Sequence, residues 1–163
     1  MFKVIFCVFM SAVVFCSPQQ QLKCSAASKY FIPNFTANWF KAYEYCNYLG
    51  MRLVIVENAI DQANLVEKIV STDKFSNATT EMWIGANDLA QESFFHWHAT
   101  GRRVQYSNWK QNQPDNAKGV EHCVEIRFIP EHGWNWHWND RECKTMRYFV
   151  CENLEIGKEI VLF

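Results

Sequence analysis

A long polar stretch from Leu89 to Val120 constrains this chain more than any other feature. It shows little helical or strand periodicity, and a connection of this length inside a compact domain is normally either functional or disordered. Tyr106, Trp109 and the turn signals at 100–101 and 113–114 favour the functional case. Because the stretch lacks a hydrophobic core of its own, we expect a bound metal to fix its shape.

The end of this stretch and the segment after it supply oxygen ligands. Gln113 and Asn139 offer amide oxygens, and the carboxylates belong to Asp115, Glu121 and Asp140. Ca²⁺ prefers such a hard, all-oxygen set. The alternative is that Gln-Pro-Asp is only a turn, as Pro-Asp dipeptides often are.

The order and spacing of Gln113-Pro114-Asp115, Glu121 and Trp138-Asn139-Asp140 resemble those of the C-type lectin domain, over most of the chain after about residue 24. The resemblance implies an α+β, C-type lectin-like fold with two helices, short and mostly antiparallel strands, and a long calcium-binding loop. It also implies Ca²⁺ as cofactor and carbohydrate binding through the five oxygen ligands. In this family the proline of the tripeptide is cis.

The order Gln-Pro-Asp also predicts a sugar preference. Family members with Glu-Pro-Asn favour mannose-like sugars, and exchanging the acid and the amide reverses the pattern of hydrogen-bond donors and acceptors. This sequence therefore resembles the galactose-type members, in particular small secreted invertebrate, insect-like lectins of innate immunity or reproduction. We expect it to bind galactose-type glycans on cell or microbial surfaces. The alternative is a module that recognises a protein or another non-sugar ligand independently of calcium.

A second calcium site is a further expectation from the resemblance. Asp88 and Glu92 match two acids of the family's auxiliary site, and Asn116 and Glu121 can add oxygens. His122 stands where several members have an acid, and imidazole is a poor ligand for a hard cation, so we expect weak or absent calcium occupancy. The alternative is that the two acids lie on an exposed turn.

An aromatic platform for the sugar is missing at its usual place, because the segment 116–120 after the tripeptide contains no aromatic residue. Trp134, Trp136 or His137 can serve instead, whereas core packing is the alternative role for these aromatic side chains. If none of them reaches the sugar, we expect weak affinity and poor galactose preference.

The N-terminus predicts secretion. Lys3 precedes an apolar stretch, Val4 to Phe15, that is short for a membrane span, so residues 1–16 read as a signal peptide rather than an uncleaved anchor. We place an N-terminal segment at 17–35, the lectin domain at 36–155 and a C-terminal tail at 156–163. The sequons at Asn34 and Asn77 predict glycosylation of a secreted protein.

The cysteine count is also consistent with secretion. Removing residues 1–16 takes two of the seven cysteines and leaves five, an odd number in an oxidising compartment. The family resemblance implies the pairs Cys46–Cys151 and Cys123–Cys143. Cys24 is then left over, and we expect it to link two chains in a homodimer; a free or capped thiol and a bridge to another protein are the alternatives.

Two helices followed by strands are predicted along the domain. Asn38 caps a first helix whose buried face carries Trp39, Ala42, Tyr43 and Cys46, and Gly50 ends it. Asn58 caps a second helix, for which we expect a buried stripe of Ala59, Ala63, Val66 and Val70. The predicted strands lie at 53–56, 82–86, 94–98, 124–128, 134–138 and 148–151.

Other function classes are disfavoured by composition. A net charge of −1 with scattered Lys and Arg argues against nucleic-acid or membrane-surface binding. Five histidines invite an enzyme hypothesis, but no HExxH helix, nucleophile elbow or Ser/His/Asp pattern accompanies them. We therefore expect a binding protein rather than an enzyme.

Overall fold

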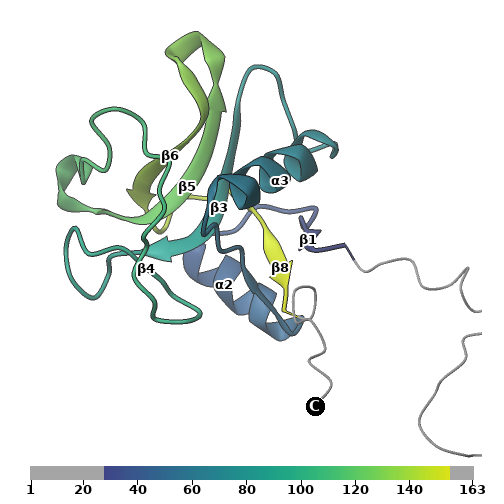
Figure 1. The fold of residues 1–163 in the computed structure, drawn as a ribbon, viewed down its shortest axis with the longest axis horizontal. Coiled ribbons are helices and arrows are strands. Elements are labelled where there is room, and N and C mark those ends of the chain that lie inside the picture. Colours follow the sequence, from purple (N-terminus) through teal and green to yellow (C-terminus); the bar gives the residue numbers. More distant parts are fainter. Residues whose placement is uncertain (1–27, 155–163) are drawn as a thin grey trace, which may run out of the picture.

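The computed structural model describes residues 28–154, which form two α-helices, two short 3₁₀ turns and two β-sheets (Figure 1). The predicted signal peptide, Cys24 and the whole predicted C-terminal tail lie outside the described residues. In chain order the elements are β1 (Tyr30–Phe31), α2 (Trp39–Tyr48), β2 (Met51–Leu53), α3 (Ala59–Val70), β3 (Thr80–Asn87), β4 (His96–Trp97), η1 (Ala117–Gly119), β5 (Glu121–Ile129), η2 (Pro130–His132), β6 (Trp134–Glu142), β7 (Tyr148–Phe149) and β8 (Cys151–Asn153).

Helix α2 forms as its sequence predicts. The Asn38 side chain accepts a hydrogen bond from the Lys41 amide at 2.9 Å, which satisfies one of the free donors of the first turn. Trp39, Ala42 and Cys46 are buried on one face, and Tyr43, predicted on the same face, is half-buried. The chain then leaves the helix at Gly50, whose φ of 69° lies in the left-handed region.

Helix α3 begins at its predicted cap, but the predicted buried stripe is wrong. Asn58 accepts hydrogen bonds from the amides of Ile60 and Asp61, both at 2.9 Å. The residues buried on this helix are Gln62, Leu65 and Ile69, whereas Ala59, Ala63 and Val70 are exposed and Val66 is half-buried. The helix is rotated so that Leu65 and Ile69, which carry more apolar surface than the two alanines, face the core.

The strands form two sheets. A small sheet has the order β1-β8-β2, and a larger one has the order β4-β3-β5-β6, with β7 added in parallel beside β3. All other named pairings are antiparallel. Because β1 pairs with β8, the small sheet begins within the segment 17–35 that we placed ahead of the domain.

Several strand boundaries differ from the prediction. The strand expected at 53–56 is β2 at Met51–Leu53, and Val54 instead bridges two segments: its amide donates to the Val150 carbonyl and its carbonyl accepts from Gly85, both at 2.9 Å. The strand expected at 134–138 continues to Glu142, so Asn139 and Asp140 belong to β6. The strand expected at 94–98 is only His96–Trp97. The strand expected at 148–151 is divided into β7 and β8.

Two apolar clusters and two disulfides hold the domain together. The larger cluster includes Leu65, Ile84, Ile126 and Trp138, and the smaller one surrounds the two disulfides. The disulfides join Cys46 to Cys151 and Cys123 to Cys143, the pairs that the family resemblance implies. The first connects α2 to β8 and the second connects β5 to the segment after β6.

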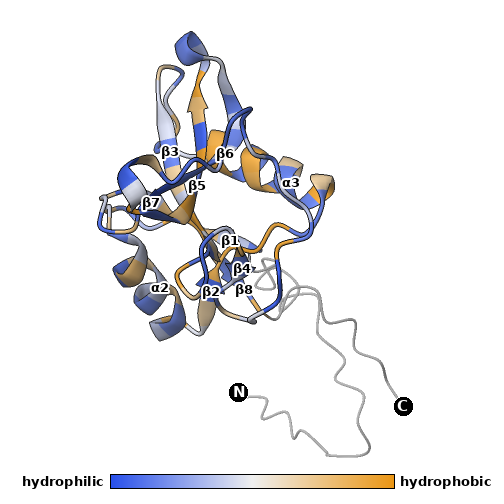
Figure 2. Ribbon diagram, turned by 90° about the vertical axis from the view of Figure 1, so that its left-hand side faces the viewer, coloured by the Kyte–Doolittle hydropathy of each residue, from blue (hydrophilic) through white to orange (hydrophobic). Residues whose placement is uncertain are grey.

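The long polar loop is anchored more firmly than its sequence predicts. Val104, Tyr106 and Trp109 pack against the larger apolar cluster, and the Trp138 amide donates to the Asn108 carbonyl at 2.7 Å. In Figure 1 the loops between β4 and β5 lie on the side of the domain away from α3, and the β5–β6 hairpin projects upward. Figure 2 shows that the tip of this hairpin is hydrophilic. No helix within 28–154 has the length and apolar character needed to cross a membrane.

Candidate functional site

Three of the predicted ligands converge in space. Asp115, Glu121 and Asp140 each offer one carboxylate oxygen, and these oxygens lie within 4.8 Å of one another. Asp115 comes from the loop before η1, Glu121 begins β5, and Asp140 lies in β6. We call these three residues the carboxylate cluster. Antiparallel pairing of β5 with β6 brings Glu121 and Asp140 together, although they are far apart in sequence.

The loop is tied to this cluster by its own backbone. The Gln113–Pro114 peptide bond is cis, as the family resemblance implies. The amides of Asp115 and Asn116 donate to the two carboxylate oxygens of Asp140, at 3.2 and 2.7 Å. Asp140 is 1 % exposed, so these contacts partly compensate a buried charge.

The two predicted amide ligands also have informative surroundings. Gln113 Oε1 is buried and accepts no hydrogen bond. A buried oxygen without a hydrogen-bond donor or a cation destabilises the fold. Asn139 donates from Nδ2 to Glu125 Oε1 at 3.0 Å, which leaves its carbonyl oxygen as the free end of the amide. A hard cation at the carboxylate cluster fits this donor set, because it would take carboxylate and amide oxygens together.

Electrostatic repulsion builds up at the cluster when no cation is present. Burial raises the pKa of Glu121, and the neighbouring charges of Asp140 and Asp115 raise it further, against the effect of Arg141 at 3.3 Å. Burial also raises the pKa of Asp140, although the amides of Asn116 and Asp115 oppose this shift. The ionised cluster is therefore poorly solvated, and a divalent cation would relieve both burial and repulsion.

A second group forms around Asp88 and Glu92, two of the residues expected at an auxiliary site. Their carboxylates lie with His122 in a set whose ligand atoms are within 4.8 Å of one another. Asn116 contributes differently from the expectation: its Nδ2 donates to Glu92 Oε2 at 2.7 Å and its Oδ1 accepts from the Glu121 amide at 2.9 Å. Asn116 thus bridges this group and the carboxylate cluster. Its side-chain oxygen already has a donor, so the amide supports Glu92 in this arrangement.

Sequence reasoning missed the side chains that support Asn139. Glu125 is fully buried opposite Asn139 in the β5–β6 ladder. Arg147 donates to Glu125 at 2.8 Å and also lies 3.2 Å from Glu81, whose other oxygen pairs with Arg127. Because successive side chains of a strand point to opposite faces, the sequence predicts that an acid between two apolar residues faces solvent. Only the arginines from neighbouring segments make its burial tolerable.

The candidate aromatic platforms are engaged within the protein. Trp136 stacks on Phe128 with ring centroids 4.9 Å apart and also lies against Phe75. Trp134 has the Arg127 guanidinium 4.3 Å and the Lys110 ammonium 4.4 Å from its ring centroid. His137 accepts a hydrogen bond from the Asn135 amide through Nδ1 at 3.1 Å. We therefore assign the first two rings to packing rather than to a sugar.

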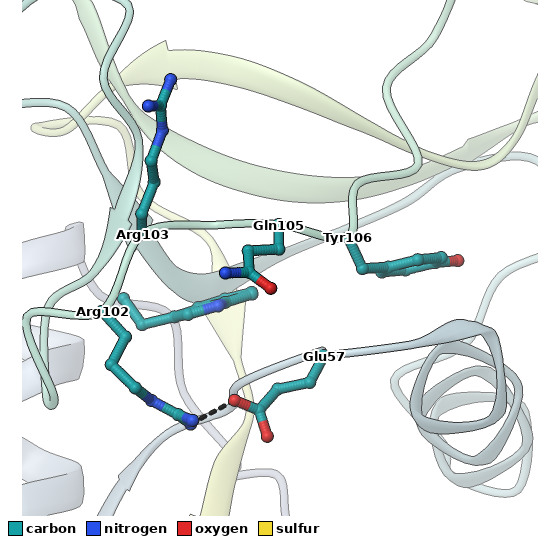
Figure 3. Close-up of a pocket in the computed structure, with 6 residues that line it drawn as sticks. Glu57, Arg102, Arg103, Gln105 and Tyr106 are labelled. Atoms are coloured by element: carbon teal, nitrogen blue, oxygen red, sulfur yellow. Dashed lines mark hydrogen bonds and ion pairs between the residues drawn. The ribbon is translucent and has the colours of Figure 1, made fainter.

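A pocket with a volume of ≈ 290 Å³ lies at a different set of residues (Figure 3). It is lined by Glu57, Trp97, Arg102, Arg103, Gln105 and Tyr106. The Arg102 guanidinium donates to the Glu57 carboxylate across it. None of the predicted ligands lines this pocket. The carboxylate cluster brings three of the predicted ligands together, so it is the better candidate site.

The predicted glycosylation sites are accessible. Asn34 and Asn77 are both exposed and lie outside helices and strands. Each carries the sequon that a secreted chain would present for modification. Attachment of a glycan at these positions stays a prediction.

Comparison with known proteins identifies the family and agrees with the fold. The profile of the Lectin C-type domain matches residues 35–153. The chain is 44 % identical over 145 residues to C-type lectin 16 of Aedes aegypti, covering 89 % of this chain and 93 % of that protein. It is 41 % identical over 134 residues to Salivary C-type lectin 1 of Aedes albopictus, covering 82 % of this chain and 88 % of that protein.

Solved structures show the same architecture. The carbohydrate-recognition domain of mouse scavenger receptor C-type lectin superposes with a TM-score of 0.63 at 28 % identity, covering 76 % of this chain and 85 % of that one. The C-type lectin CEL-I of Cucumaria echinata superposes with a TM-score of 0.62 at 26 % identity, covering 78 % of this chain and 91 % of that one.

Proposed function

Because the chain belongs to the C-type lectin domain family, we propose that it is a secreted, calcium-dependent lectin with a preference for galactose-type glycans. The ligands would be Gln113, Asp115, Glu121, Asn139 and Asp140. The observation that carries the proposal is the convergence of three carboxylates beside a loop whose Gln113 Oε1 is buried without a donor. Family membership also supports a binding role over an enzymatic one.

Sugar recognition would depend on the ligand side chains as much as on the ion. Calcium held by these oxygens supplies coordination positions that two vicinal hydroxyls of a sugar can occupy in place of water. Each hydroxyl both donates and accepts hydrogen bonds. Gln113 can donate through its amide nitrogen while Asp115 can only accept, so the two ends of the tripeptide present different partners to the sugar.

The position of the Asn139 amide depends on the side chains that hold it. Glu125 accepts from Asn139 Nδ2, and Arg147 fixes Glu125 in turn. This chain of contacts orients the Asn139 amide and keeps its oxygen available. Such outer contacts often determine metal affinity as strongly as the ligands do.

Retention on immobilised galactose is the decisive experiment. The wild-type protein should be retained in calcium and released by EDTA or free galactose. Asp140→Asn should flow through, because it removes one of two buried carboxylates from the site. Asp73→Asn is the matched control, since its side chain is 83 % exposed and lies beyond the C-terminal end of α3. Binding that ignores both EDTA and galactose would instead indicate a protein-recognition module.

The predicted sugar preference can be tested by exchanging the acid and the amide of the tripeptide. Gln113→Glu with Asp115→Asn restores the mannose-type order without changing the net charge, so the glycan-array profile should shift towards mannose or fucose. An unchanged profile would place specificity in other residues. Because Trp134 and Trp136 are engaged elsewhere, we expect the galactose affinity to be weak.

The proposed dimer through Cys24 would compensate for weak single-site affinity. Linking two shallow sites raises avidity through effective concentration when both sugars are within reach. Non-reducing electrophoresis of the secreted protein should show a dimer band that disappears with reductant and in Cys24→Ser. A monomer with one titratable thiol would exclude the dimer.

A further inference from the structure

The group formed by Asp88, Glu92 and His122 contains a nitrogen donor that a calcium site would not use. His122 Nδ1 lies 3.1 Å from Asp88 Oδ1 and 3.5 Å from Glu92 Oε2. We propose that these three side chains form a binding site for Zn²⁺ or a similar transition-metal ion, separate from the carboxylate cluster.

The donor set and its spacing suit zinc. One imidazole and two carboxylates form a common protein ligand set for Zn²⁺, whereas Ca²⁺ takes oxygen ligands. Zinc binds nitrogen at about 2.0–2.1 Å and carboxylate oxygen at about 2.0–2.2 Å, which gives tetrahedral ligands a separation of about 3.4 Å. The two measured separations from the His122 nitrogen lie on either side of this value. A small rotation of the side chains would therefore create the site.

Both carboxylates are already oriented by contacts outside the group. The Ser93 amide donates to Asp88 Oδ2 at 2.8 Å, which leaves Oδ1 facing His122. Asn116 Nδ2 donates to Glu92 Oε2 at 2.7 Å. Metal-binding carboxylates are typically held in this way by a second layer of donors, which reduces the entropy lost on binding.

Charge balance also indicates a cation. The Asp88 side chain is 1 % exposed, and burying an ionised carboxylate without a counter-ion is expensive. Within residues 28–154, His122 is the only basic side chain within 4.0 Å of the carboxylate oxygens of Asp88 or Glu92. By contrast, the buried acids Glu125 and Glu152 each have arginine or lysine partners.

The group is accessible from solvent. The Glu92 side chain is about half exposed, and His122 lines an open groove of ≈ 300 Å³ together with Leu89 and Val120. An ion can therefore enter from the Glu92 side.

Isothermal titration with zinc chloride tests this site, with calcium present in excess to fill the carboxylate cluster. The wild-type protein should bind one zinc ion per chain at this site. His122→Gln should weaken this binding about 100-fold, because it removes the only nitrogen ligand, and Glu92→Gln should weaken it at least tenfold. His132→Gln is the matched control, since His132 is exposed at η2, outside the group, and its zinc isotherm should match the wild type.

A calcium titration of each variant shows whether the fold and the carboxylate cluster survive. Loss of zinc binding with retained calcium binding in His122→Gln supports the site. Unchanged zinc binding in both His122→Gln and Glu92→Gln, or no zinc binding by the wild type, overturns it and leaves His122 as a hydrogen-bonded partner of Asp88. If His122→Gln loses both ions because Glu121 is its neighbour, the result for Glu92→Gln decides.

Discussion

Replacing Glu121 by glutamine should have opposite effects on stability with and without calcium. In calcium-free buffer the ionised Glu121 carboxylate is buried beside Asp140 and Asp115, and these surroundings raise its pKa. A raised carboxylate pKa in the folded state means that the ionised form destabilises the fold. Glutamine keeps the shape and removes the charge, so Glu121→Gln should melt at the same temperature as the wild type or higher.

The sign of the pH dependence follows from the same shift. A folded-state pKa above the unfolded value gives a stability contribution that is present below about pH 4.5 and is lost as pH rises through the folded pKa. In calcium-free buffer the wild type should therefore lose stability relative to Glu121→Gln as pH rises from about 4.5 through the raised pKa of the folded state. Loss of the contact with Arg141 works against this by less than about 1 kcal/mol, since Arg141 is 41 % exposed.

Calcium should reverse the order. At a free calcium concentration 100 times the dissociation constant, binding stabilises the folded state by about 2.7 kcal/mol. An unfolding entropy of about 2.1 cal/mol/K per residue, over roughly 130 residues, converts this to a rise in melting temperature of about 10 °C. If Glu121→Gln weakens calcium binding about 100-fold, the same concentration gives about 0.4 kcal/mol and a rise below about 2 °C.

Differential scanning calorimetry measures both effects, after the dissociation constant has been obtained by titration calorimetry. Glu131→Gln is the matched control, since Glu131 is exposed in η2 and should keep the full calcium-induced rise. A variant Glu121→Gln that keeps this rise would refute its role as a ligand. A variant that is clearly less stable than the wild type in calcium-free buffer would refute the electrostatic reasoning.

Three further predictions concern the scaffold and the site. Gly85→Ala should lower the free energy of unfolding by about 1–3 kcal/mol in a urea titration, because an added Cβ would lie 2.8 Å from a backbone carbonyl oxygen of β2; a loss below 0.5 kcal/mol would mean that the backbone adjusts freely. Replacing Cys46 and Cys151 together by alanine removes a link with a sequence separation of 105 and should cost about 4–5 kcal/mol in the same assay; wild-type stability would contradict this. Calcium-dependent retention on galactose should weaken as pH falls, because burial raises the pKa values of Glu121 and Asp140 and protons then compete with the ion; retention independent of pH down to about pH 4 would contradict the ligand assignment.

Local signals were the part of the fold that could be predicted from the sequence. Asn38 and Asn58 cap their helices because a short polar side chain reaches its own backbone, whatever the rest of the chain does. The spacing of Trp39, Ala42 and Cys46 likewise determined the buried face of α2, because these three positions fall on one side of the helix. The types of ligand atoms could also be predicted from the sequence, because they depend only on side-chain chemistry.

Burial depends on what each element packs against, and this information is not local. The buried face of α3 is set by Leu65 and Ile69 meeting the larger apolar cluster, and alanines at a similar spacing could not compete. The long loop shows the same dependence. Val104 and Trp109 of the loop pack against that cluster, and the sequence of the loop alone does not predict these contacts.

The identity of the candidate ligands was therefore present in the sequence, but their grouping was decided by the tertiary structure. Antiparallel pairing of β5 with β6 and the anchored loop bring Asp115, Glu121 and Asp140 together. Antiparallel pairing of β3 with β5 places His122 beside Asp88, which lies 34 residues earlier in the chain. The chemistry of a site follows from its residue types, whereas the choice of ion follows from which side chains the fold makes neighbours, because coordination requires the donor atoms to lie within a few ångströms of one point.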